Sequence, residues 1–269
     1  MISIRSGKGI GDNLYLQSIA RHLVDKGERL EVCTDWPDIF RPIAKEIAIS
    51  PFRRINVARV AHYTTRKKVM ETDQFQDCCL TAGVREAVDL RLDWKPSNGN
   101  LLDLLLSPGK PVVVVQMPRE PFGRSDGYGM ELLPDCSTIQ RVIDAIGSDA
   151  LIVQVGSGKA LYGFRGIEVD LAGKTSVSDL LDVASVASGF VGYCSFLVPL
   201  AESFSAPALL VWSRRGLNSR DEYIRTITPK KILHRASSRA VFDDCSDHEI
   251  AEAAYAFLDA IRNRHALCW

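Results

Sequence analysis

The sequence predicts an α/β protein of two successive units, each with a parallel sheet, that face one another across a cleft. The chain has 269 residues, of which 46% are hydrophobic, and this is enough for two domains of about 100 to 150 residues. Short β-branched runs alternate with longer segments of helical period, which is typical of parallel strands joined by crossover helices. The series is interrupted once along the chain. A single larger α/β unit is the alternative.

The first half of the sequence predicts one α/β unit. We expect strands at residues 2–5 and 29–35, a helix from residue 13 to 26, and a second helix over residues 38–47. A basic stretch of mixed character, residues 51–68, follows. Since each predicted strand leads into a helical segment, the strands of this unit should run parallel.

The interruption is a change of composition at residues 93–111, which read DWKPSNGNLLDLLLSPGKP. Three prolines and several glycine or asparagine turn signals surround one short apolar segment there. Such punctuation marks loops and boundaries rather than regular structure. We therefore divide the chain into residues 1–105 and residues 106–269.

The alternation of strands and helices restarts after this boundary. The predicted strands are residues 111–116, 150–155, 189–193 and 208–212, and the predicted helices are residues 137–146, 176–187, 199–204 and 246–264. The last helix opens with Ser246 three residues before Glu249, which is the arrangement of a capping box. Its spacing predicts a buried face made of Ile250, Ala253, Ala254, Phe257, Leu258 and Ile261.

Composition excludes several classes of protein. Lysine plus arginine equals aspartate plus glutamate, 33 each, so no overall field attracts nucleic acid or an anionic membrane. No apolar run approaches the roughly 18 residues of a membrane span, and no signal peptide is visible, so we expect a cytoplasmic protein. Seven cysteines without CxxC spacing and five histidines without paired spacing indicate neither a disulfide framework nor a metal site.

A predicted strand-to-helix loop near the N-terminus carries Gly7, Gly9, Gly11 and Asp12. Glycines let the backbone approach a ligand, and the first amides of the helix would point at it. The spacing does not fit the GxxxxGK[ST] phosphate loop. A dinucleotide fingerprint fits better, with Asp35 after the next strand as the ribose-binding acid. An NAD-dependent oxidoreductase is therefore one alternative.

Asp12 stands where that fingerprint has its third glycine, and this argues against a dinucleotide. A carboxylate there would repel the phosphates by a few kcal/mol if water is excluded. Two compatible interpretations of Asp12 stay open. It is the N-cap of the helix, worth about 1 kcal/mol, or it is a general base that accepts a proton from an incoming hydroxyl.

Residues 170–212 and the N-terminal loop resemble the heptosyltransferase-like family of GT-B glycosyltransferases. The shared positions in the second half are Leu171, Gly173, Lys174, Thr175, Ser176, Val191, Gly192, Ser195, Leu200, Ala201 and Pro207. The N-terminal stretch GIGDNLYLQSIARHL looks like the glycine and aspartate loop of the same family. The chain departs from the family pattern at Cys194, Phe196 and Pro199, and residues 50–105 show no match.

The resemblance implies two Rossmann-like domains and a metal-independent, inverting transfer of a sugar from a nucleotide-diphosphate donor to a hydroxyl. Residues 106–269 would bind the nucleotide sugar, a co-substrate rather than a cofactor, and residues 1–105 the acceptor. Asp12 would be the catalytic base. The implied donor contacts are Arg119, Arg124, Gly156, Ser157, Lys159, Cys194, Ser195 and Phe196. The acceptor contacts that we predict are Gly9, Gly11, Asn13, Arg53, Arg54 and Arg66.

The acceptor stays open between a glycan, such as a lipopolysaccharide core, and DNA with a hydroxymethylated base. Two basic clusters could receive either one, or could be solvated surface. The first holds Arg53, Arg54, Arg59, Arg66, Lys67 and Lys68, with His62 and Tyr63 among them, and the second holds Arg214, Arg215, Arg220, Arg225, Lys230, Lys231, Arg235 and Arg239. A further alternative is a protein that binds a nucleotide or nucleotide sugar without turnover, because the departures fall in the implied donor site.

Overall fold

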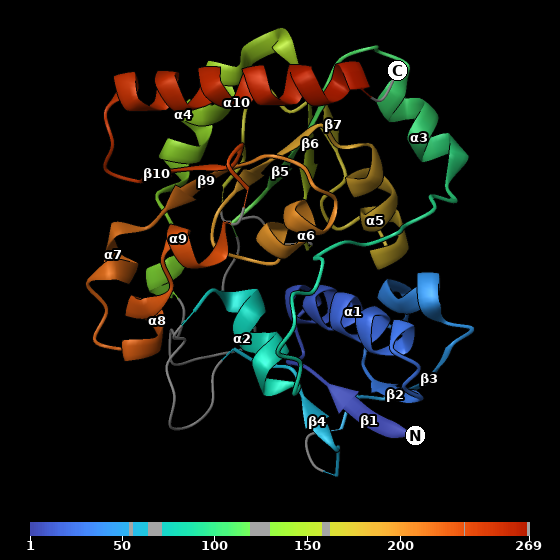
Figure 1. Ribbon diagram of the computed structural model, residues 1–269. Coiled ribbons are helices and arrows are strands. Elements are labelled where there is room, and N and C mark those ends of the chain that lie inside the picture. Colours follow the sequence, from blue (N-terminus) through green and yellow to red (C-terminus); the bar gives the residue numbers. More distant parts are fainter. Residues whose placement is uncertain (54–55, 64–71, 119–129, 158–161, 234, 268–269) are drawn as a thin grey trace.

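Two parallel sheets with flanking helices make up the protein (Figure 1). The computed structural model describes residues 1–269 apart from 54–55, 64–71, 119–129, 158–161, 234 and 268–269. Within the described residues the first sheet has 4 strands and the second has 6. All of the strand pairs run parallel. The predicted fold class is confirmed.

The first sheet has the order β3-β2-β1-β4. Its strands are β1 (Ile2–Arg5), β2 (Leu30–Cys33), β3 (Ile47–Ser50) and β4 (Arg59–Val60). Its helices are α1 (Ile10–Asp25), the 3-10 helix η1 (Pro37–Ile43) and α2 (Gln74–Thr81). Because β1 lies between β2 and β4, the loops that follow β1 and β4 emerge side by side at the carboxyl edge of the sheet.

The second sheet has the order β10-β9-β8-β5-β6-β7. Its strands are β5 (Val112–Gln116), β6 (Leu151–Val155), β7 (Val169–Asp170), β8 (Gly189–Gly192), β9 (Ala208–Trp212) and β10 (Arg239–Phe242). Its longer helices are α3 (Gly99–Leu106), α4 (Cys136–Ile146), α5 (Val177–Val186), α6 (Leu197–Ser203) and α10 (Asp247–Leu267). The shorter ones are η2 (Met130–Leu132), η3 (Gly147–Asp149), α7 (Arg214–Leu217), α8 (Glu222–Thr226) and α9 (Pro229–Ile232).

The central strand β5 shows how the second unit is layered. Val113 and Val115 belong to one apolar cluster with α4 and α10, whereas Val112 and Val114 belong to another with α5 and α6. Successive side chains of a strand point to opposite faces, so a strand covered on both faces is apolar throughout. Figure 1 shows α4 and α10 above the sheet and α5 and α6 below it, on the side of the first unit.

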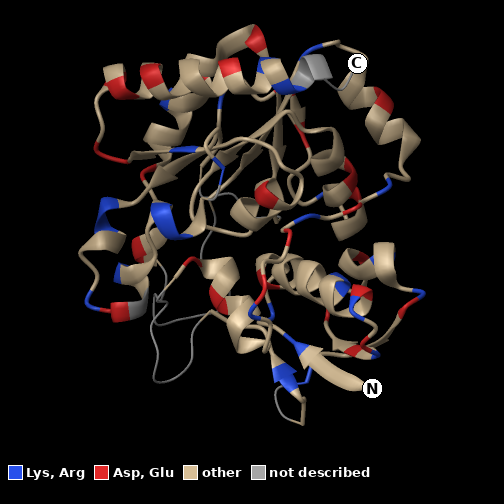
Figure 2. Ribbon diagram, in the orientation of Figure 1, with Lys and Arg blue, Asp and Glu red and all other residues tan. Residues whose placement is uncertain are grey.

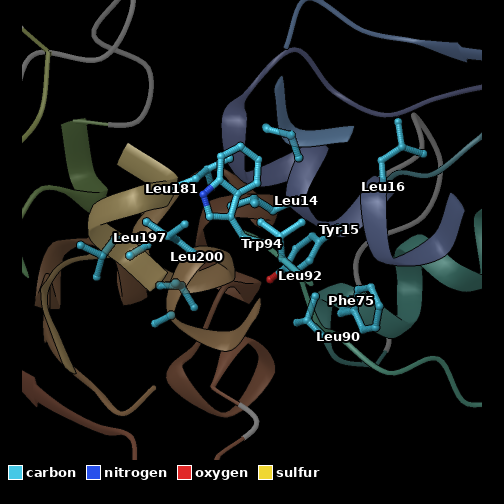
Figure 3. Packing of buried hydrophobic residues seen from close by; sticks show 14 of the residues in the cluster. Leu14, Tyr15, Leu16, Phe75, Leu90, Leu92, Trp94, Leu181, Leu197 and Leu200 are labelled. Carbon is cyan, nitrogen blue, oxygen red and sulfur yellow. The ribbon is translucent and has the colours of Figure 1, made fainter. Parts of the chain in front are cut away.

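The two units share one apolar core, and this core fixes how they sit together. Leu14 and Tyr15 of α1 belong to the same buried cluster as Leu181 of α5 and as Leu197 and Leu200 of α6. Figure 3 shows these side chains converging from both units. Burial of these apolar side chains where the two units meet stabilises the association of the units through the hydrophobic effect.

The segment that connects the units is fastened to both of them. Trp94 donates its indole N–H to a carboxylate oxygen of Asp182 on α5, at 2.6 Å. Two backbone N–H groups, of Ser97 and Asn98, donate to the other oxygen of Asp182 at 3.1 and 2.8 Å. From the first unit, the guanidinium of Arg41 in η1 lies 3.7 Å from the centroid of a Trp94 ring.

The connecting segment also contains the predicted domain limit. The chain leaves the first sheet after β4 and enters the second sheet at β5. Between these strands, α3 packs against α5 of the second unit. The division at residue 105 falls near the end of α3, and it stays a prediction. None of the helices in the described part of the chain is both long and apolar enough to cross a membrane.

Several predicted elements differ from those observed. The first helix begins at Ile10 rather than residue 13, so Gly9 is its N-cap and the prediction that Asp12 is the cap is wrong. The predicted helix at 38–47 is a 3-10 helix that ends at Ile43 and contains Pro42, since proline removes a backbone donor. The capping box of α10 is confirmed, with Glu249 accepting from the Ser246 N–H at 2.8 Å. The predicted buried face of α10 is confirmed except at Ala253, which is half-buried.

Candidate active site

The glycine loop between β1 and α1 is built around the carboxylate of Asp12. The backbone N–H of Gly9 donates to Asp12 Oδ2 at 3.3 Å. A Cβ atom on Gly7 would collide with this carboxylate, and one on Gly9 would lie 3.1 Å from Oδ2. Gly7 and Gly9 thus leave the space that the acid occupies. Asp12 is the third residue of α1, in the first turn, where a negative charge favourably meets the helix dipole.

Asp12 is half-buried, and its surroundings change its acidity. Burial raises the pKa of Asp12 above its ordinary value of 3.8, which is the largest effect. The charge of His62, the Gly9 N–H and a hydrogen bond from Tyr63 lower the pKa again, without cancelling the effect of burial. A carboxylate whose pKa is moved toward neutrality is a better proton acceptor.

Asn13 holds the loop in place from inside the protein. Its side chain is buried and donates to the carbonyl oxygens of Gly7 and Gly9 at 3.1 and 2.8 Å. Its own amide oxygen accepts from the Thr34 hydroxyl at 2.8 Å. These bonds serve the loop conformation, so a contact between Asn13 and an acceptor stays a prediction without structural support.

The loop between β8 and α6, in the second unit, forms the other side of the candidate site. Ser195 donates its hydroxyl to the amide oxygen of Gln116, at the end of β5, and accepts from the Leu197 N–H at 3.3 Å. Gln116 in turn lies 3.4 Å from the hydroxyl of Tyr193. Cys194 is half-buried beside them, and burial raises the pKa of its thiol to about 12, so the thiol stays protonated at neutral pH.

The glycine loop and the Ser195 loop come into contact where the helices α1 and α6 begin. Phe196 is the N-cap of α6, and its Cα atom would lie 3.2 Å from a Cβ added to Gly11. Gly11 is therefore covered by α6, and its predicted contact with an acceptor stays a prediction. This close approach brings the turn that carries Asp12 next to the loop that carries Ser195.

The other predicted donor contacts follow β5 and β6. Gly156 comes directly after β6 and has a φ of +149°, a backbone region that is open essentially to glycine. Its carbonyl accepts from the Gly173 N–H at 2.7 Å, which ties this loop to the turn before α5. Ser157 is exposed beside it. Arg119, Arg124 and Lys159 lie outside the described residues.

Several residues of the basic clusters form ion pairs with acids. In the first cluster, Arg53 forms an ion pair with Glu31, and Arg59 forms one with Glu28; Arg54, Arg66, Lys67 and Lys68 lie outside the described residues. In the second, Arg214 pairs with Asp244 at 3.0 Å. Figure 2 shows blue segments on α7, α8 and α9, with red segments interspersed.

Sequence reasoning missed three side chains of the site. His62 and Tyr63 act on Asp12, although the sequence shows them only as members of a basic stretch. Gln116 supports Ser195, and the one signal for it is a polar residue at the end of four valines. Among the described residues, no three histidine, cysteine or acidic side chains are grouped so that they could hold a metal ion.

The two parallel sheets and the loops that meet between them are those of a GT-B-like α/β fold. Comparison with protein-family models finds no match, and comparison with curated proteins finds none either. Comparison with solved structures gives clear similarities. The glycosyl transferase family 9 protein from Veillonella parvula matches with a TM-score of 0.67 at 9% identity, over 95% of this chain and 96% of that one.

Two heptosyltransferases are also similar in structure. TibC, a dodecameric iron-containing heptosyltransferase solved with ADP-D-β-D-heptose, has a TM-score of 0.59 at 16% identity, over 98% of this chain and 76% of that one. ADP-heptose LPS heptosyltransferase II of E. coli has a TM-score of 0.57 at 14% identity, over 96% and 98%. The likeness that the sequence motifs indicated is thus confirmed as a likeness of fold.

Proposed function

We propose that this protein is a glycosyltransferase that moves a sugar from a nucleotide-diphosphate donor to a hydroxyl group. The observation that carries the proposal is the position of Asp12. Its carboxylate has a raised pKa and stands in the turn of α1 that packs against the start of α6. The similarity in fold to heptosyltransferases supports the same reaction class. An acid at this place fits a base better than a pyrophosphate cradle.

In the proposed reaction Asp12 takes the proton of the acceptor hydroxyl. The acceptor oxygen forms a bond to the anomeric carbon, while the bond from that carbon to the diphosphate breaks and its electron pair leaves with the diphosphate. Donors fixed on the side of the second unit would meet the charge that develops on the leaving group. We assign this part to the Ser195 loop, together with Arg119 and Arg124, as the resemblance implies.

Two finer features belong to the proposal. One carboxylate acting on the face opposite the leaving group predicts inversion at the anomeric carbon, by analogy with inverting glycoside hydrolysis. The transfer is also proposed to be metal-independent. Product stereochemistry by NMR tests the first feature, and activity after exhaustive dialysis against a chelator tests the second. We place the protein in the cytoplasm, where nucleotide sugars are present.

The reaction class is tested in two steps. Thermal-shift measurements against a panel of nucleoside diphosphates and their sugars identify the donor, because a ligand at 100 times its dissociation constant adds about 2.7 kcal/mol of stability. Transfer by Asp12→Asn is then compared with that by Asp25→Asn, an exposed acid at the other end of α1.

We expect Asp12→Asn to keep donor affinity while transfer falls by roughly 10² to 10⁴. Asp25→Asn should behave as the wild type. Unaltered turnover of Asp12→Asn would remove Asp12 from the mechanism. Donor binding without any transfer or hydrolysis by the wild-type protein would instead favour a protein that sequesters a nucleotide sugar.

A further inference from the structure

Two residues that follow β4 act on the carboxylate of Asp12. Tyr63 donates a hydrogen bond to it, and the charge of His62 favours its ionised form. The rings of His62 and Tyr63 are stacked, with centroids 4.8 Å apart and planes 14° from parallel. The histidine and the tyrosine thus form one rigid pair beside the acid.

The topology of the first sheet places this pair. β4 runs parallel to β1, with Arg5 paired to Val60, and the Ala61 N–H donates to the Arg5 carbonyl at 2.8 Å. The residues that follow β4 therefore emerge beside the glycine loop that follows β1. The backbone of His62 is fixed further, because its N–H donates to the hydroxyl of Thr81, on α2, at 2.9 Å.

Two other titratable groups lie near Asp12 and stay protonated near neutral pH. Burial raises the pKa of Tyr15 on α1 and of Cys78 on α2 well above their ordinary values, and the charge of Asp12 raises both pKa values further.

We propose that Asp12, Tyr63 and His62 act as one unit, in which Tyr63 orients the carboxylate and His62, stacked on the tyrosine ring, holds Tyr63 in place. Tyr63 and His62 are positioning residues in this unit, and Asp12 is the group that meets the acceptor. The hydrogen bonds from Gly9 and Tyr63 hold the carboxylate in one orientation. Its use in transfer rests on the proposed function, whereas the arrangement of the three residues does not.

The effect of Tyr63 and His62 on Asp12 is measured on the full-length protein without any substrate. The carboxyl carbons of ¹³C-labelled aspartates are titrated by NMR, and Asp12→Asn identifies the signal of Asp12 by its loss. In the wild type we expect the midpoint of the Asp12 titration to lie above the ordinary value of 3.8, because burial is the largest effect on its pKa.

Two variants separate the roles within the unit. Tyr63→Phe keeps the ring stack and removes the hydroxyl, so the midpoint of the Asp12 titration should move to higher pH. His62→Gln removes the ring stack and the charge that lowers the pKa of Asp12, so the midpoint should again move to higher pH. Two matched controls, Tyr255→Phe on the exposed face of α10 and His22→Gln in the last turn of α1, should leave the Asp12 curve unchanged.

An Asp12 titration with the same midpoint in the wild type and in both variants would overturn the inference. The melting temperature of each variant shows whether it is folded, and His62→Gln gives an independent readout if Tyr63→Phe is not. The outcome is separate from the proposed function. Shifted Asp12 midpoints in the two variants with full transfer by Asp12→Asn would contradict the function and keep the unit, and unchanged midpoints with lost transfer would do the reverse.

Discussion

Gly11 of α1 packs so closely against Pro199 of α6 that an added Cβ atom would lie 2.9 Å from the Cγ atom of the proline. The backbone of Phe196 lies almost as near, at 3.2 Å from the same position. Real Cβ atoms do not approach other atoms so closely, and backbone cannot move aside as a flexible side chain can. The glycine therefore sets the distance between the glycine loop and the loop of Ser195.

Gly11→Ala should lower the free energy of unfolding by about 1 to 3 kcal/mol, because it overpacks the join between the units. The matched control is Gly99→Ala in the first turn of α3, where an added Cβ meets no atom within 4 Å. The control should be neutral or stabilising by up to about 1 kcal/mol. Urea unfolding of both variants measures the difference, and equal stabilities would show that the contact with α6 is loose.

The anchor of the connecting segment should be a second sensitive point. Asp182 is 1% exposed and accepts from the Trp94 indole and from two backbone N–H groups. Asp182→Ala leaves these buried donors without their acceptor and should cost about 3 kcal/mol. Asp103→Ala, at an exposed position of α3, should change the unfolding free energy by less than about 0.5 kcal/mol.

An ion pair with one buried partner joins α6 to the chain before β10. The Glu202 side chain is 2% exposed and the Arg235 side chain 30%, and they lie 3.2 Å apart. Because water still reaches the guanidinium, Glu202→Ala should cost about 1 to 2 kcal/mol. Glu252→Ala on the exposed face of α10 is the control. If chemical denaturation shows the same midpoint for both variants, the pair contributes nothing to the position of α6.

The raised pKa of Asp12 predicts how stability changes with pH. Below the ordinary value of 3.8 the group is protonated in both the folded and the unfolded protein. Above it the unfolded chain ionises first, so the carboxylate reduces the stability of the fold until the pH passes the folded pKa. Asp12→Asn has no carboxylate at this position, so ionisation there does not reduce the stability of the variant. The variant should therefore be more stable than the wild type at about pH 8, and the excess should shrink toward about pH 4.

We predict a glycan acceptor rather than DNA, because several of the described basic residues are already paired with acids. Arg59 and Arg214 are neutralised by Glu28 and Asp244, and Arg235 is committed to Glu202. A protein that neutralises 6 to 10 phosphates loses about 10³ to 10⁵ in affinity for duplex DNA between 50 and 200 mM salt. We expect no such loss here in a fluorescence-anisotropy titration. Tight binding with a steep salt dependence would favour the DNA acceptor.

Local signals in the sequence predicted four of the six strands that the structure describes in the second unit, but not β7 or β10. Three runs of apolar residues leave no polar face for solvent, so they predicted strands that are covered on both faces. The structure confirms them as β5, β6 and β9, at the four valines before Gln116 and within residues 150–155 and 208–212. The short strand β4 and the helix α2 were not predicted. They lie in or near a stretch of mixed charge, whose strand is held by pairing with β1 rather than by a period of its own.

The sequence by itself determined the alternation of strands and helices, the glycine loop with its aspartate, and the resemblance that led to the GT-B-like fold. These are properties of residues near one another in the chain, and composition and spacing carry them. Tertiary structure alone decided that Tyr63 and His62 reach Asp12, that Gln116 supports Ser195, and that Gly11 lies against α6. Such contacts depend on which strands pair and which helix faces meet, and no local pattern encodes the partner of a side chain that is distant in the chain.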